Sequence, residues 1–170
     1  MEETAASSFL DRFWNGVLPI NPAALAQAAG LRVLPLSWDD SVAGLSGALH
    51  WHQEPNDPQP VLHCRFNSTE SVERQRFTIA HEVGHYALGH IKNQETLFRD
   101  TNEVFTGRVY DPVEVQANRF AAALLMPAKL VQQAINNDGL RTVPALAARF
   151  GVSVSAMRWR LVNLGFLSSL

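Results

Sequence analysis

The sequence contains a single cysteine, Cys64, among its 170 residues, so no disulfide can form within the chain. Its longest uninterrupted apolar run, residues 120–128, is 9 residues long and includes a proline, whereas a membrane span needs about 20 apolar residues. Residues 1–16 lack the basic and apolar regions of a secretory signal. We therefore expect a cytoplasmic protein with no membrane partner.

An excess of charge of one sign is also lacking, because 14 lysines and arginines nearly balance 16 aspartates and glutamates. This balance excludes a basic surface over the whole molecule as a nucleic-acid site. The distribution is nonetheless uneven: residues 141–170, which we call the tail, contain four arginines and no acidic residue. With 46% apolar residues and no internal repeat, the chain is expected to form one compact domain with a helical appendage.

Hydrophobic periodicity predicts an α+β fold with a small sheet beside a set of helices. Three segments rich in β-branched and aromatic residues predict a three-stranded antiparallel sheet, at residues 31–36, 42–51 and 60–66. Two long helices are expected, one at 68–90 with Asn67 as its N-cap and one at 111–126 with Asp111 as its N-cap, joined by a long polar loop at 92–110. Shorter helices are expected at 22–30, 128–137, 142–150 and 153–164.

The first long helix contains the sequence His-Glu-Val-Gly-His, with His81 and His85 at its ends. Because four residues make just over one helical turn, the two imidazoles emerge on one face and can bind one Zn²⁺. Glu82 is offset around the helix and can instead reach a water on the metal. The alternative is an amphipathic helix that happens to carry two histidines. Val83 and Gly84 disfavour it, since glycine costs a helix about 1 kcal/mol and indicates a close approach of another backbone.

Glu114, early in the second long helix, is the best candidate for the third protein ligand that a hydrolytic zinc requires. Asn118 lies one turn later on the same face, where it can hydrogen-bond the second nitrogen of a ligand histidine. The alternative for Glu114 is a purely structural role, in which its charge complements the helix dipole behind the cap Asp111.

Two segments resemble the signature blocks of the ImmA/IrrE family of zinc metallopeptidases: RQRFTIAHEVGHYALGH at residues 74–90 and EVQANRFAAALLMP at residues 114–127. Their order, their spacing and the Leu-Leu-Met-Pro ending carry the resemblance. It extends over residues 60–165 and is loose before them. It implies a zincin-like metallopeptidase domain in residues 1–140, followed by a helix-turn-helix-like tail packed on the same domain.

The resemblance also implies the role of each site residue. By it, His81, His85 and Glu114 bind one Zn²⁺ per chain. Glu82 takes a proton from the attacking water and returns it to the leaving amine. A second group that stabilises the oxyanion is usual in such chemistry, and four residues are within reach, each with a packing or surface role as its alternative: Tyr86, His90, Arg108 and Tyr110. On a straight helix His90 points away from His81, so we expect no fourth protein ligand.

The implied activity is endopeptidase cleavage of a protein partner, an XRE-type helix-turn-helix transcriptional repressor, in a stress or mobile-element switch. Two alternatives remain. One is a non-catalytic regulator that binds DNA or protein and contains a structural zinc. The other is the toxin module of a toxin-antitoxin pair. Glu82 favours the enzyme, because a structural zinc site does not need it.

The tail supports a DNA-binding alternative. Ala147 and Gly151 have the spacing of a helix-turn-helix, and Arg158, Trp159 and Arg160 would lie on its recognition helix. The apolar residues of the tail can equally close a helical bundle. We therefore favour a structural or substrate-docking role for it over DNA contact.

The predicted strands carry another group of metal-ligand residue types, His50, His52, His63 and Cys64. Strand alternation places His50 and His52 on one face. Because no Cys-x-x-Cys or comparable spacing accompanies them, we expect ordinary surface or core residues.

Overall fold

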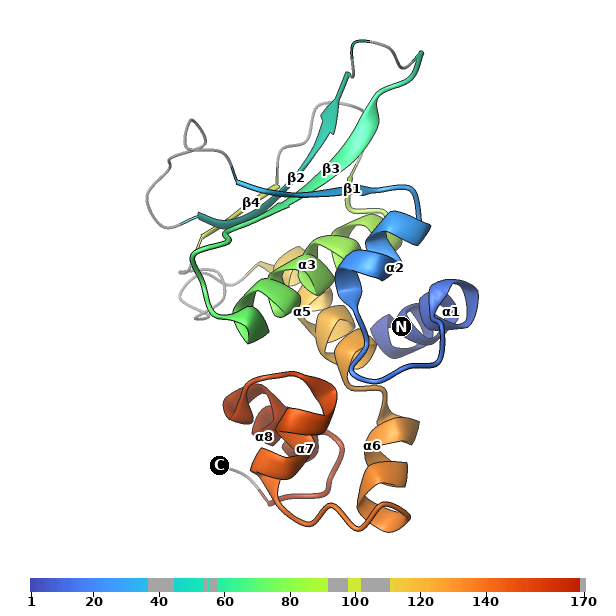
Figure 1. The fold of residues 1–170 in the computed structure, drawn as a ribbon, viewed down its shortest axis with the longest axis vertical. Helices are drawn as coiled ribbons and strands as arrows, with labels where there is room; N and C mark the ends of the chain where they lie inside the picture. The colour runs from blue at the N-terminus through green and yellow to red at the C-terminus, as the bar shows by residue number, and fades with distance from the viewer. Residues whose placement is uncertain (37–44, 54, 56–57, 92–97, 102–110, 169–170) are drawn as a thin grey trace.

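The computed structural model describes residues 1–36, 45–53, 55, 58–91, 98–101 and 111–168. Within them the fold is α+β, with the sheet at one end of the molecule and the C-terminal helices at the other (Figure 1). The described strands are β1 (Arg32–Pro35), β2 (Leu45–His52), β3 (Val61–Phe66) and β4 (Phe98–Thr101). The described helices are α1 (Glu2–Phe13), α2 (Pro22–Ala28), α3 (Val72–Ala87), α5 (Pro112–Leu125), α6 (Ala128–Asn136), α7 (Val143–Phe150) and α8 (Val154–Asn163).

The sheet is mixed, so the prediction of a purely antiparallel sheet is wrong. Its strand order is β1-β3-β2-β4, in which β2 pairs antiparallel with β3 and with β4 but β1 runs parallel to β3. Alternation of apolar residues predicts a strand but not its direction, which explains the error for β1. The fourth strand lies in the segment predicted to be a loop, where four residues, FRDT, are too few to show an apolar pattern.

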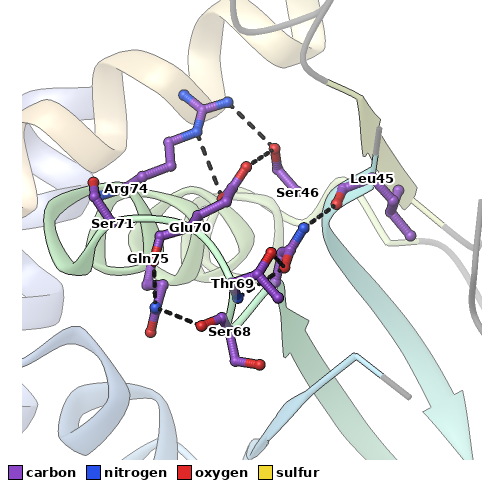
Figure 2. Close-up of polar contacts among 9 residues, drawn as sticks. Leu45, Ser46, Ser68, Thr69, Glu70, Ser71, Arg74 and Gln75 are labelled. Atoms are coloured by element: carbon purple, nitrogen blue, oxygen red, sulfur yellow. Dashed lines mark hydrogen bonds and ion pairs between the residues drawn. The ribbon is translucent and has the colours of Figure 1, made fainter. Parts of the chain in front are cut away.

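Helix α3 begins later than predicted, because its N-cap is Ser71 and not Asn67. Ser71 Oγ accepts a hydrogen bond from the backbone N–H of Arg74. Asn67 instead bridges to the sheet, where its Nδ2 donates to the carbonyl of Leu45 at 3.2 Å. Ser46 Oγ also donates to Glu70 Oε1 at 2.8 Å, so the turn before α3 is fastened to the start of β2 (Figure 2).

Helix α3 lies between the sheet and α5 (Figure 1), and its glycine lies at a close approach of the two helices. A Cβ on Gly84 would meet the carbonyl oxygen of Ala117 and Cδ1 of Phe120, both at 3.1 Å. The expected reason for this glycine is confirmed. Helix α5 begins at the predicted cap, since Asp111 accepts from the N–H of Val113. Helix α1, which the sequence analysis did not predict, packs on α5.

The tail contains α7 and α8 at the predicted positions, joined through Gly151 in the left-handed conformation (φ 62°). Arg160 of α8 is only 5% exposed, because its Nε donates to the carbonyl of Met126 at 2.9 Å and its guanidinium pairs with Glu3. Arg76 of α3 donates to the carbonyls of Gly151 and Ile20. These contacts hold the tail against the helices that precede it.

A membrane span is not found among the described helices, none of which is both long and apolar enough.

Candidate metal centre

Three side chains from α3 and α5 converge inside the molecule. His81 Nε2 lies 2.9 Å from His85 Nε2 and 3.0 Å from Glu114 Oε2, and His85 Nε2 lies 3.4 Å from Glu114 Oε1. These separations are close to the edge of about 3.3 Å expected for ligands arranged tetrahedrally around zinc with bonds of 2.0–2.1 Å. Both imidazoles are fully buried and Glu114 is 8% exposed. The structure therefore brings together three residues that can hold a metal ion.

The hydrogen-bond partners of the two imidazoles direct their Nε2 atoms toward this point. His81 Nδ1 lies 2.9 Å from Asn118 Oδ1, and an amide oxygen can only accept, so the proton of His81 is on Nδ1. The Nε2 lone pair of His81 therefore faces Glu114. Lone pairs brought this close together are satisfied by a cation that lies between them. Two imidazole nitrogens and a carboxylate form a ligand set that fits zinc.

His85 is held in the same way through a two-residue chain. Gln116 Oε1 lies 3.1 Å from His90 Nε2, so that nitrogen donates and His90 Nδ1 is left to accept from His85 Nδ1 at 3.2 Å. Burial and the neighbouring His85 lower the pKa of His90, which keeps its ring neutral as this role requires.

The expectation that His90 points away from the site is wrong, because α3 does not continue to residue 90. The helix ends at Ala87, and Gly89 adopts a positive φ of 70°. The N–H of His90 then bonds to the carbonyl of His85 and the N–H of Gly89 to that of Tyr86, which is a Schellman ending. This ending folds His90 back beside His85. Gly89 is the signal in the sequence that marks this helix end.

The charge of Glu114 is set by its surroundings. Burial raises the pKa of this carboxyl, but hydrogen bonds and positive charge from His81 and His85, when these imidazoles are protonated at Nε2, outweigh burial and lower the pKa well below its usual range. A cation held at this point would favour the ionised carboxylate in the same way, so Glu114 can act as an anionic ligand.

Glu82 is fully buried and lies on the sheet side of α3. A Cβ added to Gly47 of β2 would be 2.7 Å from Glu82 Oε1 and 2.4 Å from Thr78 Cγ2. The absence of a side chain at residue 47 thus makes room for the Glu82 carboxyl between α3 and β2. Neither Gly47 nor Gln116 was predicted from the sequence, because their contacts depend on how separate elements pack.

Among the remaining oxyanion candidates, the structure describes Tyr86, which is not brought to the metal-ligand group. Tyr86 is 38% exposed, and its hydroxyl contacts the carbonyl of Ala29 on the side of α2, at 3.5 Å. Arg108 and Tyr110 lie outside the described residues.

Comparison with known families gives a match that covers most of the chain. The family described as Peptidase_M78, IrrE N-terminal-like domain, matches residues 28–162. This range includes both long helices and every residue of the candidate metal centre.

Curated relatives agree with this match. The chain is 33% identical over 136 residues to the radiation response metalloprotease IrrE of Deinococcus radiodurans, covering 78% of this chain and 36% of that protein. It is 37% identical over 100 residues to IrrE of Deinococcus deserti, covering 57% of this chain and 34% of that protein. It is 29% identical over 126 residues to the metallopeptidase ImmA of Bacillus subtilis, covering 74% of this chain and 69% of that protein. The chain thus spans about a third of the length of the two IrrE proteins.

Proposed function

Because this chain belongs to the IrrE N-terminal-like peptidase family, we propose that it is a zinc-dependent endopeptidase that hydrolyses a peptide bond in a protein partner. One observation carries the proposal: two imidazole nitrogens and a carboxylate lie 2.9–3.4 Å from one another, and the buried Glu82 is adjacent to the first ligand in the sequence. In this proposal His81, His85 and Glu114 hold one zinc ion.

The chemistry divides between the metal and the protein. A bound Zn²⁺ supplies a Lewis acid for the scissile carbonyl and makes water a better nucleophile at neutral pH. Glu82 accepts the proton of the attacking water and donates it to the amine that leaves, so the proton count balances over the reaction. Asn118 and His90 keep the ligand imidazoles in the tautomer that offers Nε2 to the metal.

For the partner, we propose an XRE-type helix-turn-helix repressor that is cleaved in a stress response. Two sequence relatives that carry the words "radiation response" in their names support the stress setting. Purified XRE-type repressors are the substrates to test first. Incubation with zinc-loaded protein should yield two fragments, and mass spectrometry of the fragments would identify the bond.

The tail fits a structural or substrate-docking role better than DNA contact. Of the residues that would lie on a recognition helix, Arg160 is buried and engaged with Met126 and Glu3. Trp159 remains 57% exposed, a large apolar surface that suits a protein partner more than a phosphate backbone.

Two variants test the site assignment, and they should separate metal binding from catalysis. Glu114→Ala removes a ligand, so we expect elemental analysis to show that it loses the zinc of this site after dialysis against a mild chelator. Glu82→Gln preserves the size of the side chain, so we expect it to retain one zinc at this site and the wild-type circular dichroism spectrum while cleavage is abolished. Full proteolysis by Glu82→Gln would show that the proposed acid/base is wrong.

A further inference from the structure

A second group of imidazoles lies on the sheet, at the end of β2 and the start of β3. His50 and His63 are paired directly across the two antiparallel strands. His52 lies two residues further along β2 and therefore on the same face as His50. From the sequence, only His50 and His52 were expected to share a face. The strand register adds His63, which no spacing along the chain could reveal.

The three rings are close enough to share an ion. One nitrogen from each lies within 4.8 Å of the other two. The ring centroids of His52 and His63 are 4.7 Å apart, and those of His50 and His63 are 5.5 Å apart. Tetrahedral ligands of zinc are separated by about 3.3 Å, a distance that small rotations of these side chains can reach.

This face of the sheet is separate from the candidate metal centre. Leu49 and Cys64, which are paired across the same two strands, are fully buried and belong to the core that the helices cover. The histidines occupy the alternate positions and therefore point to the opposite face. An ion bound by them would be a different ion from the one held by α3 and α5.

We propose that His50, His52 and His63 form a second metal site, for a divalent transition-metal ion of the kind that imidazole prefers, such as Zn²⁺. His63 is 3% exposed while His52 is exposed, so the site would be anchored inside the sheet and open to solvent at its rim. Imidazole nitrogens suit zinc, copper and nickel, whereas calcium and magnesium require oxygen ligands. Three protein ligands leave one tetrahedral position for water.

Among the described residues, two arginines lie beside His63 on this face: Arg32 of β1, which is paired with His63 in the parallel register, and Arg65, two residues beyond His63 on β3. Their positive charges oppose a cation, although Arg65 directs its guanidinium to the carbonyl of Pro35. Arg32 is exposed, however, and a long arginine side chain can keep its guanidinium in water. An ion shared by β2 and β3 would fasten the two strands near their connection.

The test counts ions in the intact chain with zinc as the probe. Wild type, His52→Gln and Trp51→Gln are equilibrated with the same free zinc concentration and analysed for metal per chain. Trp51 is the matched control, because it lies between the two histidines of β2 and points to the other face. We expect two zinc ions in wild type and in Trp51→Gln, and one in His52→Gln.

Two results would overturn the proposal: the same number of zinc ions in His52→Gln as in wild type, or no zinc in a folded Glu114→Ala. His52 is exposed, so its replacement is not expected to impair folding, which circular dichroism would verify. Glu114→Ala provides an independent reading, since it should lose the ion of the other centre and keep this one. The outcome does not depend on whether the chain cleaves peptides.

Discussion

At the scale of single residues, the hydrogen-bond partner of one imidazole nitrogen determines whether the other nitrogen can bind a metal ion. Asn118 Oδ1 holds His81 Nδ1 at 2.9 Å, which leaves Nε2 as the metal ligand. Replacing this acceptor with an apolar group should therefore weaken zinc binding without removing a ligand. We expect Asn118→Leu to lower zinc affinity about 10- to 100-fold, measured by competition with a chelator of known affinity.

Asn118→Asp is the control for this change, because it restores an acceptor at the same place. It should bind zinc nearly as tightly as wild type. Equal affinity for Asn118→Leu and wild type would mean that the contact does not orient His81.

Much of the metal centre was predictable because its parts are local. The spacing of His81 and His85 lies within one helix, and Asn118 follows Glu114 by one turn of another. His90 was predicted on the wrong side because a helix was extended past Gly89. Gln116 was not predicted, since its contact with His90 joins α5 to the end of α3 and leaves no periodic pattern.

At the scale of elements, the position of Glu82 depends on how closely β2 approaches α3. A methyl group on Gly47 would lie 2.4 Å from Thr78 Cγ2 and 2.7 Å from Glu82 Oε1. We expect Gly47→Ala to displace Glu82 and to reduce peptide cleavage strongly while zinc content stays at the wild-type value. Overpacking of this kind costs about 1–3 kcal/mol of stability.

A second change provides the test of this cause. Thr78→Ser removes the methyl group that the new Cβ would strike, so the double variant Gly47→Ala/Thr78→Ser should recover part of the cleavage rate. If the single variant cleaves at the wild-type rate, the approach of β2 does not position Glu82.

The prediction of elements was most accurate where a cap or a proline marked an end. Asp111 and Pro112 define the start of α5 in the sequence and in the structure. Asn67 was predicted to be the N-cap because Glu70 follows it by three residues, which is the pattern of a capping box. In the structure both side chains instead form hydrogen bonds with β2. Long-range contacts of this kind compete with local capping, and the sequence does not show which prevails.

At the scale of the whole molecule, the two ends of the chain are joined through Arg160. Its Nε donates to the buried carbonyl of Met126, and its guanidinium pairs with Glu3 of α1. We expect Arg160→Met to lower the free energy of unfolding by about 1–3 kcal/mol, because the carbonyl is left without its donor. Chemical denaturation measures this loss.

Arg158 of the same helix is exposed and serves as the control. Arg158→Met should change stability by no more than about 0.5 kcal/mol. Equal losses in the two variants would indicate that α8 is not fastened through Arg160.

The single cysteine reports on the opening of the whole fold. Cys64 is fully buried in the sheet, and burial, assisted by the nearby Glu82, raises the pKa of its thiol well above the usual range. The thiolate that reacts with alkylating reagents is therefore suppressed in the folded chain. We expect iodoacetamide to label Cys64 only as fast as the protein unfolds, and intact-protein mass spectrometry measures the labelling rate.

The same reaction measures how zinc affects unfolding. Since zinc binds the folded chain, zinc at 100 times its dissociation constant should slow the labelling of Cys64 about 100-fold relative to labelling in the presence of a chelator. The slowing should be smaller in Glu114→Ala, and a wild-type rate that zinc leaves unchanged would show that Cys64 is exposed by local opening of the sheet alone.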